Sequence, residues 1–237
     1  MSGPRFLDEE ILSEGRRHIC RVLNGKYDKE TSPQRDSFVR ADGLRKITNA
    51  WWADSFLERI ATDTRIGYAA AKLLNVKEVY LWKDHLIIKE GKSGERGNVG
   101  WHQDKPYWDE SSSDKMLTVS IALDNFTEEN GCLMFVPGSH KLGFIQGADF
   151  YDSTFDKQVR GAVACPIPAG YATFHHSMTL HGSGPNNMQQ SRVALAIHVV
   201  DGDAKLTKQK DDEAYDISVG DLFRGPRFPR IWSPRTI

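Results

Sequence analysis

The sequence contains little cysteine. Cys20, Cys132 and Cys165 are the only three cysteines in 237 residues, and they are widely spaced. A disulfide framework or a thiolate zinc site usually has more cysteines at short, paired spacings, so reduced thiols fit the sequence better than either. The N-terminal residues (MSGPRFLDEEILSEG) also lack the apolar core of a secretory signal. We therefore expect reduced thiols in a cytoplasmic protein.

Long apolar runs and net charge are lacking too. No segment approaches the roughly 20 apolar residues that a membrane helix needs. The formal net charge is -1, so no overall field is expected to draw the chain to nucleic acid or to an anionic membrane. A small-molecule substrate is the expected partner, and the sequence carries no indication of the oligomeric state.

The length suits a single domain spanning residues 1–237. Composition and periodicity divide it into a helical part at about 1–76, a strand-rich core at about 77–201 and a tail at 202–237. The tail ends in RGPRFPRIWSPRTI. It is interpreted either as a lid or partner-binding segment or as a crossing back over the surface.

The first part predicts two helices. Apolar residues at helical spacing run from Phe6 to Leu23, and again from Asp54, a suitable N-cap, to about Leu74. The polar stretch from Asp28 to Ser37 is interpreted as a loop.

From Lys77 onward, short apolar runs alternate with turn residues such as Asn130-Gly131. This pattern predicts a mainly β fold with flanking α-helices, either a sandwich or a barrel. The predicted strands are Glu78–Lys89, Met116–Leu123, Cys132–Val136, Ala162–Pro166, Tyr171–His175 and Val193–Val200.

One segment, GNVGWHQDKPYW, has metal-ligand spacing. In an extended strand, His102 and Asp104 would point to the same face. A third candidate ligand, His181, stands between turn residues in TLHGSGPN. Two histidines and one carboxylate form the facial triad of non-haem Fe(II) oxygenases. His-x-Asp alone is a weak signal, and the prediction depends on the combination.

Such a triad leaves three coordination positions open. A 2-oxo acid can occupy two of them, and O2 the third. Arg192 follows His181 by 11 residues and could form a bidentate pair with the far carboxylate of 2-oxoglutarate. The predicted cofactors are therefore Fe(II), 2-oxoglutarate as cosubstrate and O2.

Three stretches resemble the phytanoyl-CoA dioxygenase family in order and spacing: WHQDKPYW, LTVSIALDNFTEENGCLMFVPGSHKLG and TLHGSGPNNMQQSRVALAIHVV. The resemblance covers roughly Val79 to Asp201. It implies a double-stranded β-helix (jelly roll, cupin-like) with flanking helices, and dependence on Fe(II) and 2-oxoglutarate.

The resemblance also implies roles for single residues. The implied iron ligands are His102, Asp104 and His181, and the implied 2-oxoglutarate contacts are Arg192, Thr118, Ser183 and His85. Trp108 matches an aromatic position near the substrate. Lys89-Glu90-Gly91 stands where the family usually has Lys-Pro-Pro, a departure that bears on substrate recognition.

Other residues have two interpretations. Lys83 and Arg224 are candidates for substrate binding, together with Trp108, although a packing or solvated role would also explain them. His175 and His176 could compete with His181 as ligands. A packing role or a hydrogen bond behind the metal ligands fits them better, because neither is followed by an arginine at the right distance.

The predicted function is a 2-oxoglutarate-dependent dioxygenase that oxidises a small molecule and releases succinate and CO2. Hydroxylation is the default outcome, and desaturation, epimerisation or ring rearrangement are alternatives. The competing interpretation is a metal-dependent jelly-roll isomerase or hydrolase, which would need neither 2-oxoglutarate nor Arg192. A binding protein would be expected to have lost the triad.

Overall fold

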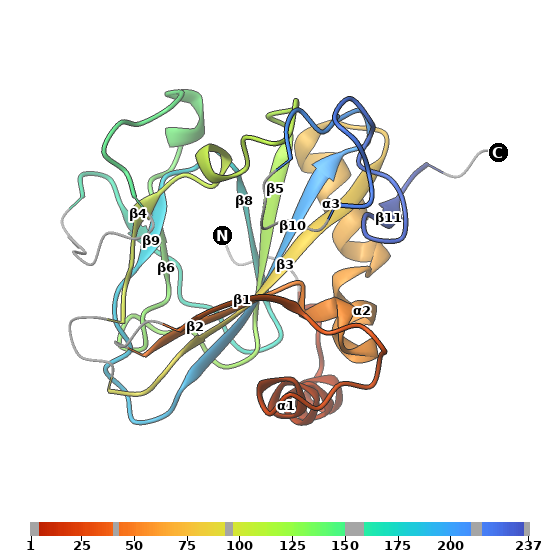
Figure 1. The fold of residues 1–237 in the computed structure, drawn as a ribbon. Helices are drawn as coiled ribbons and strands as arrows, with labels where there is room; N and C mark the ends of the chain where they lie inside the picture. Colours follow the sequence, from red (N-terminus) through yellow and green to blue (C-terminus); the bar gives the residue numbers. More distant parts are fainter. Residues whose placement is uncertain (1–4, 40–42, 93–96, 150–158, 210–214, 235–237) are drawn as a thin grey trace.

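Two antiparallel sheets and three α-helices make up the part of the chain that the structure describes (Figure 1). The computed structural model describes residues 5–39, 43–92, 97–149, 159–209 and 215–234. The helices cover one face of the larger sheet, and the smaller sheet lies on its other side (Figure 1). This architecture confirms the predicted mainly β jelly roll with flanking helices.

The larger sheet has the order β1-β2-β3-β10-β5-β8, and β11 also pairs with β3. Its strands are β1 (Gln34–Val39), β2 (Leu44–Thr48), β3 (Val79–Lys89), β5 (Met116–Ala122), β8 (Ala172–His176), β10 (Arg192–Asp201) and β11 (Arg230–Trp232). The smaller sheet has the order β4-β9-β6-β7. Its strands are β4 (Val99–His102), β6 (Leu133–Phe135), β7 (Val163–Ala164) and β9 (His181–Ser183).

Alternation along the central strands separates the core from a cavity. On β10, Leu195, Ile197 and Val199 are buried against the helices, whereas the residues between them face the smaller sheet and line the cavity. Because side chains alternate along a strand, one face of the sheet can be apolar while the other carries polar groups. The helices therefore stabilise one face and leave the other for chemistry.

Three α-helices, α1 (Glu9–Leu23), α2 (Ser55–Ala61) and α3 (Thr64–Leu74), cover the apolar face. Short 3-10 helices occupy Ala50–Trp52, Lys105–Tyr107 and Ser139–Lys141. The helix predicted from Asp54 to Leu74 is in fact two helices. The side chain of Asp63 accepts a hydrogen bond from the Arg65 backbone N–H and starts α3, so the chain bends after Ala61.

The predicted loop from Asp28 to Ser37 was partly wrong, because strand β1 begins at Gln34. Strands β1 and β2 join the larger sheet through β3, so the part at about 1–76 is not only helical. The alternation in these two strands is too short and too polar to mark them as strands. Their pairing with β3 supplies the missing stabilisation.

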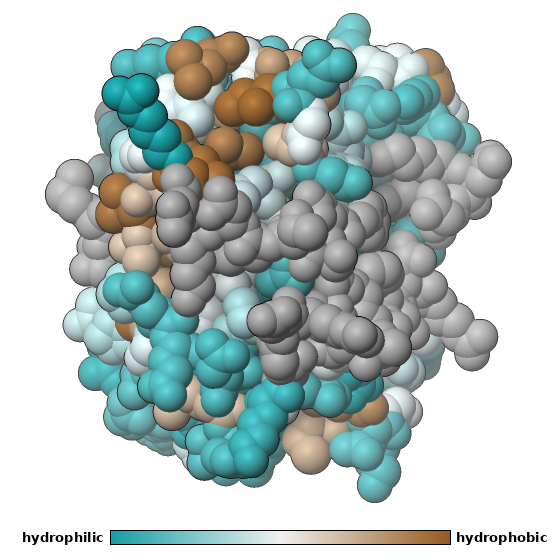
Figure 2. Space-filling view, turned by 90° about the vertical axis from the view of Figure 1, so that its left-hand side faces the viewer, coloured by the Kyte–Doolittle hydropathy of each residue, from teal (hydrophilic) through white to brown (hydrophobic). Residues whose placement is uncertain are grey.

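The tail crosses back over the surface, as one of its two interpretations predicted. β11 pairs with β3 near Tyr80, and Phe223, Phe228 and Ile231 are buried. Figure 2 shows the side of the molecule at the smaller sheet, where hydrophilic surface predominates and hydrophobic groups gather toward the upper left. Among the helices of the described ranges, none has the length and apolar character needed to cross a membrane.

We expect Asp54→Ala to destabilise the fold strongly. The Asp54 carboxylate is fully buried, accepts from the Leu57 backbone N–H at 3.0 Å and lies 2.8 Å from His18 Nδ1 on α1. Losing both interactions should lower the free energy of unfolding by about 2–3 kcal/mol, measured by urea denaturation. The matched change Asp63→Ala removes a more exposed cap and should cost about 1 kcal/mol. Equal losses would contradict a joint capping and helix-linking role of Asp54.

The carboxyl of Asp84 should make stability depend on pH. It is fully buried on the helix side of β3, and burial raises its pKa to about 7. Because the folded pKa exceeds the unfolded value, its contribution to stability is present below about pH 4 and is lost as the pH rises through about 7. Asp84→Asn should therefore gain stability relative to the wild type, by up to about 4 kcal/mol, between pH 5 and pH 8. Denaturation at both pH values, with the exposed Asp114→Asn as control, measures this. A parallel pH dependence of wild type and Asp84→Asn would refute it.

Candidate metal centre

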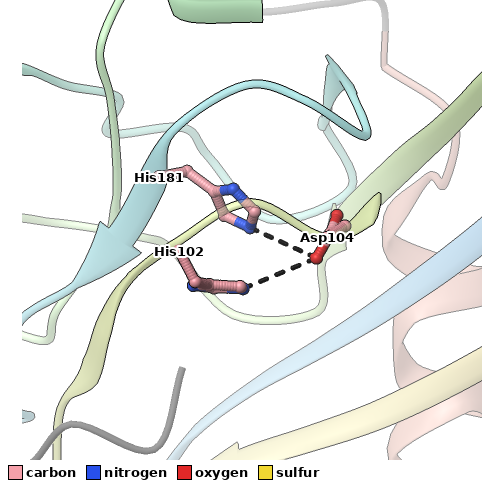
Figure 3. Close-up of side chains that lie close together, drawn as sticks. All are labelled: His102, Asp104 and His181. Atoms are coloured by element: carbon pink, nitrogen blue, oxygen red, sulfur yellow. Dashed lines mark ion pairs between the residues drawn. The ribbon is translucent and has the colours of Figure 1, made fainter. Parts of the chain in front are cut away.

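The smaller sheet brings two histidines side by side. β4 ends at His102 and β9 begins at His181, and these two residues are paired across the strands. Asp104 follows in the turn after β4, with φ -71° and ψ -41°. The expectation that an extended strand carries both His102 and Asp104 was therefore wrong. The strand ends first, and the turn carries the carboxylate back toward both imidazoles (Figure 3).

The three side chains converge on one carboxylate oxygen. Asp104 Oδ1 lies 3.5 Å from His102 Nε2 and 3.7 Å from His181 Nε2. All three residues are buried. His102 Nδ1 lies 2.9 Å from the Gly100 carbonyl oxygen, and His181 Nδ1 lies 2.9 Å from that of Thr179. Each carbonyl accepts the Nδ1 proton, so the lone pair of each neutral ring is on Nε2 and faces Asp104.

The local electrostatics match a cation site. Burial, together with the nearby His102 and His175, holds the pKa of His181 well below its ordinary value. The pKa of Asp104 is also well below its ordinary value, because the surrounding imidazoles of His181, His102 and His175 outweigh the effect of burial. A neutral His181 and an ionised Asp104 are in the protonation states that metal ligation requires.

This donor set fits Fe(II). It offers two imidazole nitrogens and one carboxylate oxygen, all within 4.8 Å of one another. Mixed nitrogen and oxygen ligation with open positions is the facial arrangement of non-haem iron oxygenases, and no thiolate is among these ligands. The residues would hold the ion through His102 Nε2, His181 Nε2 and Asp104 Oδ1.

The second carboxylate oxygen of Asp104, Oδ2, is held by residues of the larger sheet. Thr118 Oγ1 donates a hydrogen bond to Asp104 Oδ2 at 2.7 Å, and His175 Nε2 lies 3.3 Å from the same oxygen. Thr118 has one proton, so it must accept from His198 Nδ1, which lies 2.9 Å away. His198 Nε2 in turn lies 2.8 Å from His85 Nδ1. Thr118 was predicted to contact 2-oxoglutarate, and here its hydroxyl is committed to the carboxylate.

Burial keeps His198 and His85 uncharged. It lowers the pKa of His198 to about 3 and the pKa of His85 well below its ordinary value, and the charges of Lys83 and Lys46 contribute to both shifts. A neutral His198 that donates through Nδ1 must accept through Nε2, so His85 donates through Nδ1. The series of hydrogen bonds thus runs in one direction: His85 donates to His198, His198 to Thr118, and Thr118 to Asp104.

A cavity of about 240 Å³ lies between the sheets, beside these ligands. Arg192 lines its far end and is 3% exposed. Its guanidinium stacks 4.1 Å from the centroid of the Phe126 ring, and Nη2 donates to the Gly131 carbonyl oxygen. Burial lowers its pKa to about 10, so it remains a cation at neutral pH. Its buried Nε has no hydrogen-bond partner in the described part of the chain, which suits an incoming carboxylate.

Lys89 and Lys46 also line the cavity, and sequence reasoning missed Lys46. Lys89 is directly opposite Arg192 in the β3–β10 pair. Its Nζ donates to Ser183 Oγ at 2.6 Å and to the carbonyl oxygens of Ser183 and Gly184. Lys89 matches the lysine of the family's usual Lys-Pro-Pro, and the departure lies at Glu90 and Gly91. Lys46 stands on β2, which the sequence did not predict.

The other predicted site residues divide into two groups. Trp108, Lys83, His85 and Ser183 line the cavity, as their predicted roles require. Arg224 is not among its lining residues. It is half exposed and its Nη2 lies 3.4 Å from Glu78 Oε2, because the tail that carries it packs against the outer end of β3. The structure therefore does not support substrate binding by Arg224.

The model of the phytanoyl-CoA dioxygenase (PhyH) family matches residues 5–194. The chain belongs to this family. The family confirms the predicted enzyme class, a non-haem iron oxygenase that uses 2-oxoglutarate.

Two curated relatives match different shares of the chain. Phytanoyl-CoA dioxygenase domain-containing protein 1 of Danio rerio is 24% identical over 214 residues, which are 83% of this chain and 72% of that protein. A probable alpha-ketoglutarate-dependent hypophosphite dioxygenase of Stutzerimonas stutzeri is 34% identical over 119 residues, 45% of this chain and 41% of that protein. The chain thus spans less than half the length of the second relative.

A solved structure shows the same fold. The non-haem alpha-ketoglutarate-dependent epimerase SnoN from nogalamycin biosynthesis superposes with a TM-score of 0.76 at 24% identity, covering 98% of this chain and 93% of that one. This agreement extends over the helices as well as the sheets.

We expect Thr118→Val to weaken metal binding by about 10- to 100-fold, because it removes the hydrogen bond that orients Asp104. Anaerobic Fe(II) or Co(II) titration of the protein without 2-oxoglutarate measures the affinity directly. Thr118→Ser keeps the hydroxyl and should bind metal like the wild type. If Thr118→Val retains wild-type affinity, Thr118 does not position the carboxylate.

Proposed function

We propose that His102, Asp104 and His181 hold Fe(II), that Arg192 binds 2-oxoglutarate, and that the enzyme hydroxylates a small molecule. One observation carries the proposal. The Nε2 atoms of both histidines face Asp104 Oδ1 at the same cavity that Arg192 lines. A metal-dependent isomerase or hydrolase would not need Arg192 in that cavity.

Each residue has a stated task in this proposal. When bound, iron with 2-oxoglutarate supplies the activation of O2 that converts the cosubstrate to succinate and CO2. Arg192 forms a charge-assisted pair with the distal carboxylate, which fixes the direction of the cosubstrate. Ser183, held by Lys89, closes the wall beside it. Thr118 keeps Asp104 Oδ2 away from the metal, so that Oδ1 alone faces the histidines.

Hydroxylation remains the default among several outcomes that the same ligands can serve, including desaturation, epimerisation and ring rearrangement. The likeness to SnoN is a likeness of fold at 24% identity and does not select epimerisation. His85 and Trp108 line the cavity near the ligands, and we assign His85 to the cosubstrate side and Trp108 to the substrate side. We also propose a cytoplasmic location, supported by the three free cysteines.

Adding 2-oxoglutarate to the Fe(II) protein without oxygen should produce the weak visible charge-transfer band of the chelate. His102→Ala should lose both this band and succinate formation, because one of three ligands is gone. His140→Ala, which changes an exposed histidine outside the cavity, serves as the control. Succinate formation at the wild-type rate in His102→Ala would exclude the ligand assignment.

Arg192→Met should raise the 2-oxoglutarate concentration needed for half-maximal succinate formation by about 10- to 100-fold, because a charge-assisted pair is lost. The metal affinity measured without cosubstrate should stay within about twofold of the wild type, since Arg192 acts on the cosubstrate and not on the metal ligands. An unchanged 2-oxoglutarate requirement would show that another group binds the distal carboxylate.

A further inference from the structure

The cavity has two cationic ends on neighbouring strands. Lys89 is paired with Arg192 at one end of β3, and Lys83 is paired with His198 six residues earlier. At about 3.3 Å per residue, these two lysines are about 20 Å apart along the strand. Between them, Ala194 and Ala196 face the cavity and leave room for a ligand.

One end is assigned by the proposed function, on which this inference rests. Arg192 binds the distal carboxylate of 2-oxoglutarate, whose other end reaches the metal. A five-carbon diacid is much shorter than the separation of the two ends, so it cannot also occupy the end at Lys83. That end is left for the second reactant.

Lys83 is built into the wall at this second end. It is 5% exposed, and its Nζ lies 4.1 Å from the centroid of the Trp82 ring. Its charge helps to lower the pKa of both His85 and His198, so the groups around it see a positive field. An ammonium has three N–H donors, so Lys83 can hold an anionic group of a ligand beside its other contacts.

Four of the lining residues are cationic: Lys46, Lys83, Lys89 and Arg192. In the proposed function Arg192 holds the distal carboxylate of 2-oxoglutarate. The lysines that line the rest of the cavity are therefore the groups that could donate hydrogen bonds to a further anion.

The register places Lys83 within reach of the reaction. Lys83, His198, Thr118 and His175 form one row across β3, β10, β5 and β8, and Thr118 holds Asp104. Two strand spacings separate Lys83 from Thr118, which is about 10 Å. A small molecule bound at Lys83 would extend from there toward the metal.

We infer that the substrate is a small molecule with an anionic group, such as a carboxylate, phosphonate or sulfonate, and that Lys83 binds this group. Lys83 is then a specificity-determining residue. The anion lies at the Lys83 end of the row, and the carbon that is oxidised lies nearer to Asp104.

The test uses small anions and neutral compounds of similar shape. Propionate is compared with propionamide, and methanesulfonate with dimethyl sulfone. Each is added without oxygen to the protein loaded with Fe(II) and 2-oxoglutarate, and binding is read from the change in the visible band. Wild type should bind each anion at least about tenfold more tightly than its neutral counterpart.

Lys83→Met should reduce this preference to within about twofold, whereas Lys83→Arg should keep it, because the positive charge remains. Lys72→Met removes an exposed lysine on α3 and should behave like the wild type. The band itself shows that each variant is folded and loaded, and Lys83→Gln replaces Lys83→Met if the latter fails to load.

Three results would overturn the assignment: no binding of either anion, equal binding of anions and neutral compounds by the wild type, or an undiminished preference in the uncharged Lys83 variant. A wild-type protein that gives no band with Fe(II) and 2-oxoglutarate would instead refute the proposed function itself. The two failures are thus distinguishable.

Discussion

The site depends on one carboxylate whose two oxygens are used differently. Oδ1 of Asp104 faces the Nε2 atoms of His102 and His181, while Oδ2 accepts a hydrogen bond from Thr118. A free carboxylate could turn and offer both oxygens to a metal. The hydrogen bond prevents this, so the larger sheet controls a ligand that the smaller sheet carries. The relative placement of the two sheets is therefore part of the coordination chemistry.

The larger sheet can exert that control because polar side chains on its cavity face are aligned in rows across neighbouring strands. Each row crosses several strands, and its members are buried on the cavity face, opposite the hydrophobic core. Buried polar groups are stable only when they are hydrogen-bonded, and the direction of donation from His85 through His198 to Thr118 satisfies this condition. Rigid strands hold such groups more accurately than loops do.

The sequence identified the residues that the structure brings to one cavity. His102, Asp104, His181 and Arg192 lie in short motifs with fixed spacing, so they could be named as candidates without coordinates. The pairing of Lys89 with Arg192 depends on the register of two strands that are about 100 residues apart in the chain, and no local pattern contains it. Arg224 was misplaced for the same reason, because a long-range contact with Glu78 decides its position. The turn at Asp104 was missed because the expected strand ends two residues early, although the carboxylate still reaches the same point.

One edge of β3 is shared by two segments from distant parts of the chain. β2 pairs with the stretch from His85 to Lys89, and β11 pairs with Val79 and Tyr80. During synthesis, β2 can cover the stretch from His85 to Lys89 early, because it precedes β3 in the chain. Val79 and Tyr80 stay uncovered until β11, near position 230, has been made. An uncovered strand edge invites pairing with other chains, so the nascent protein passes through a stage in which its central sheet is vulnerable to aggregation until the last segment emerges.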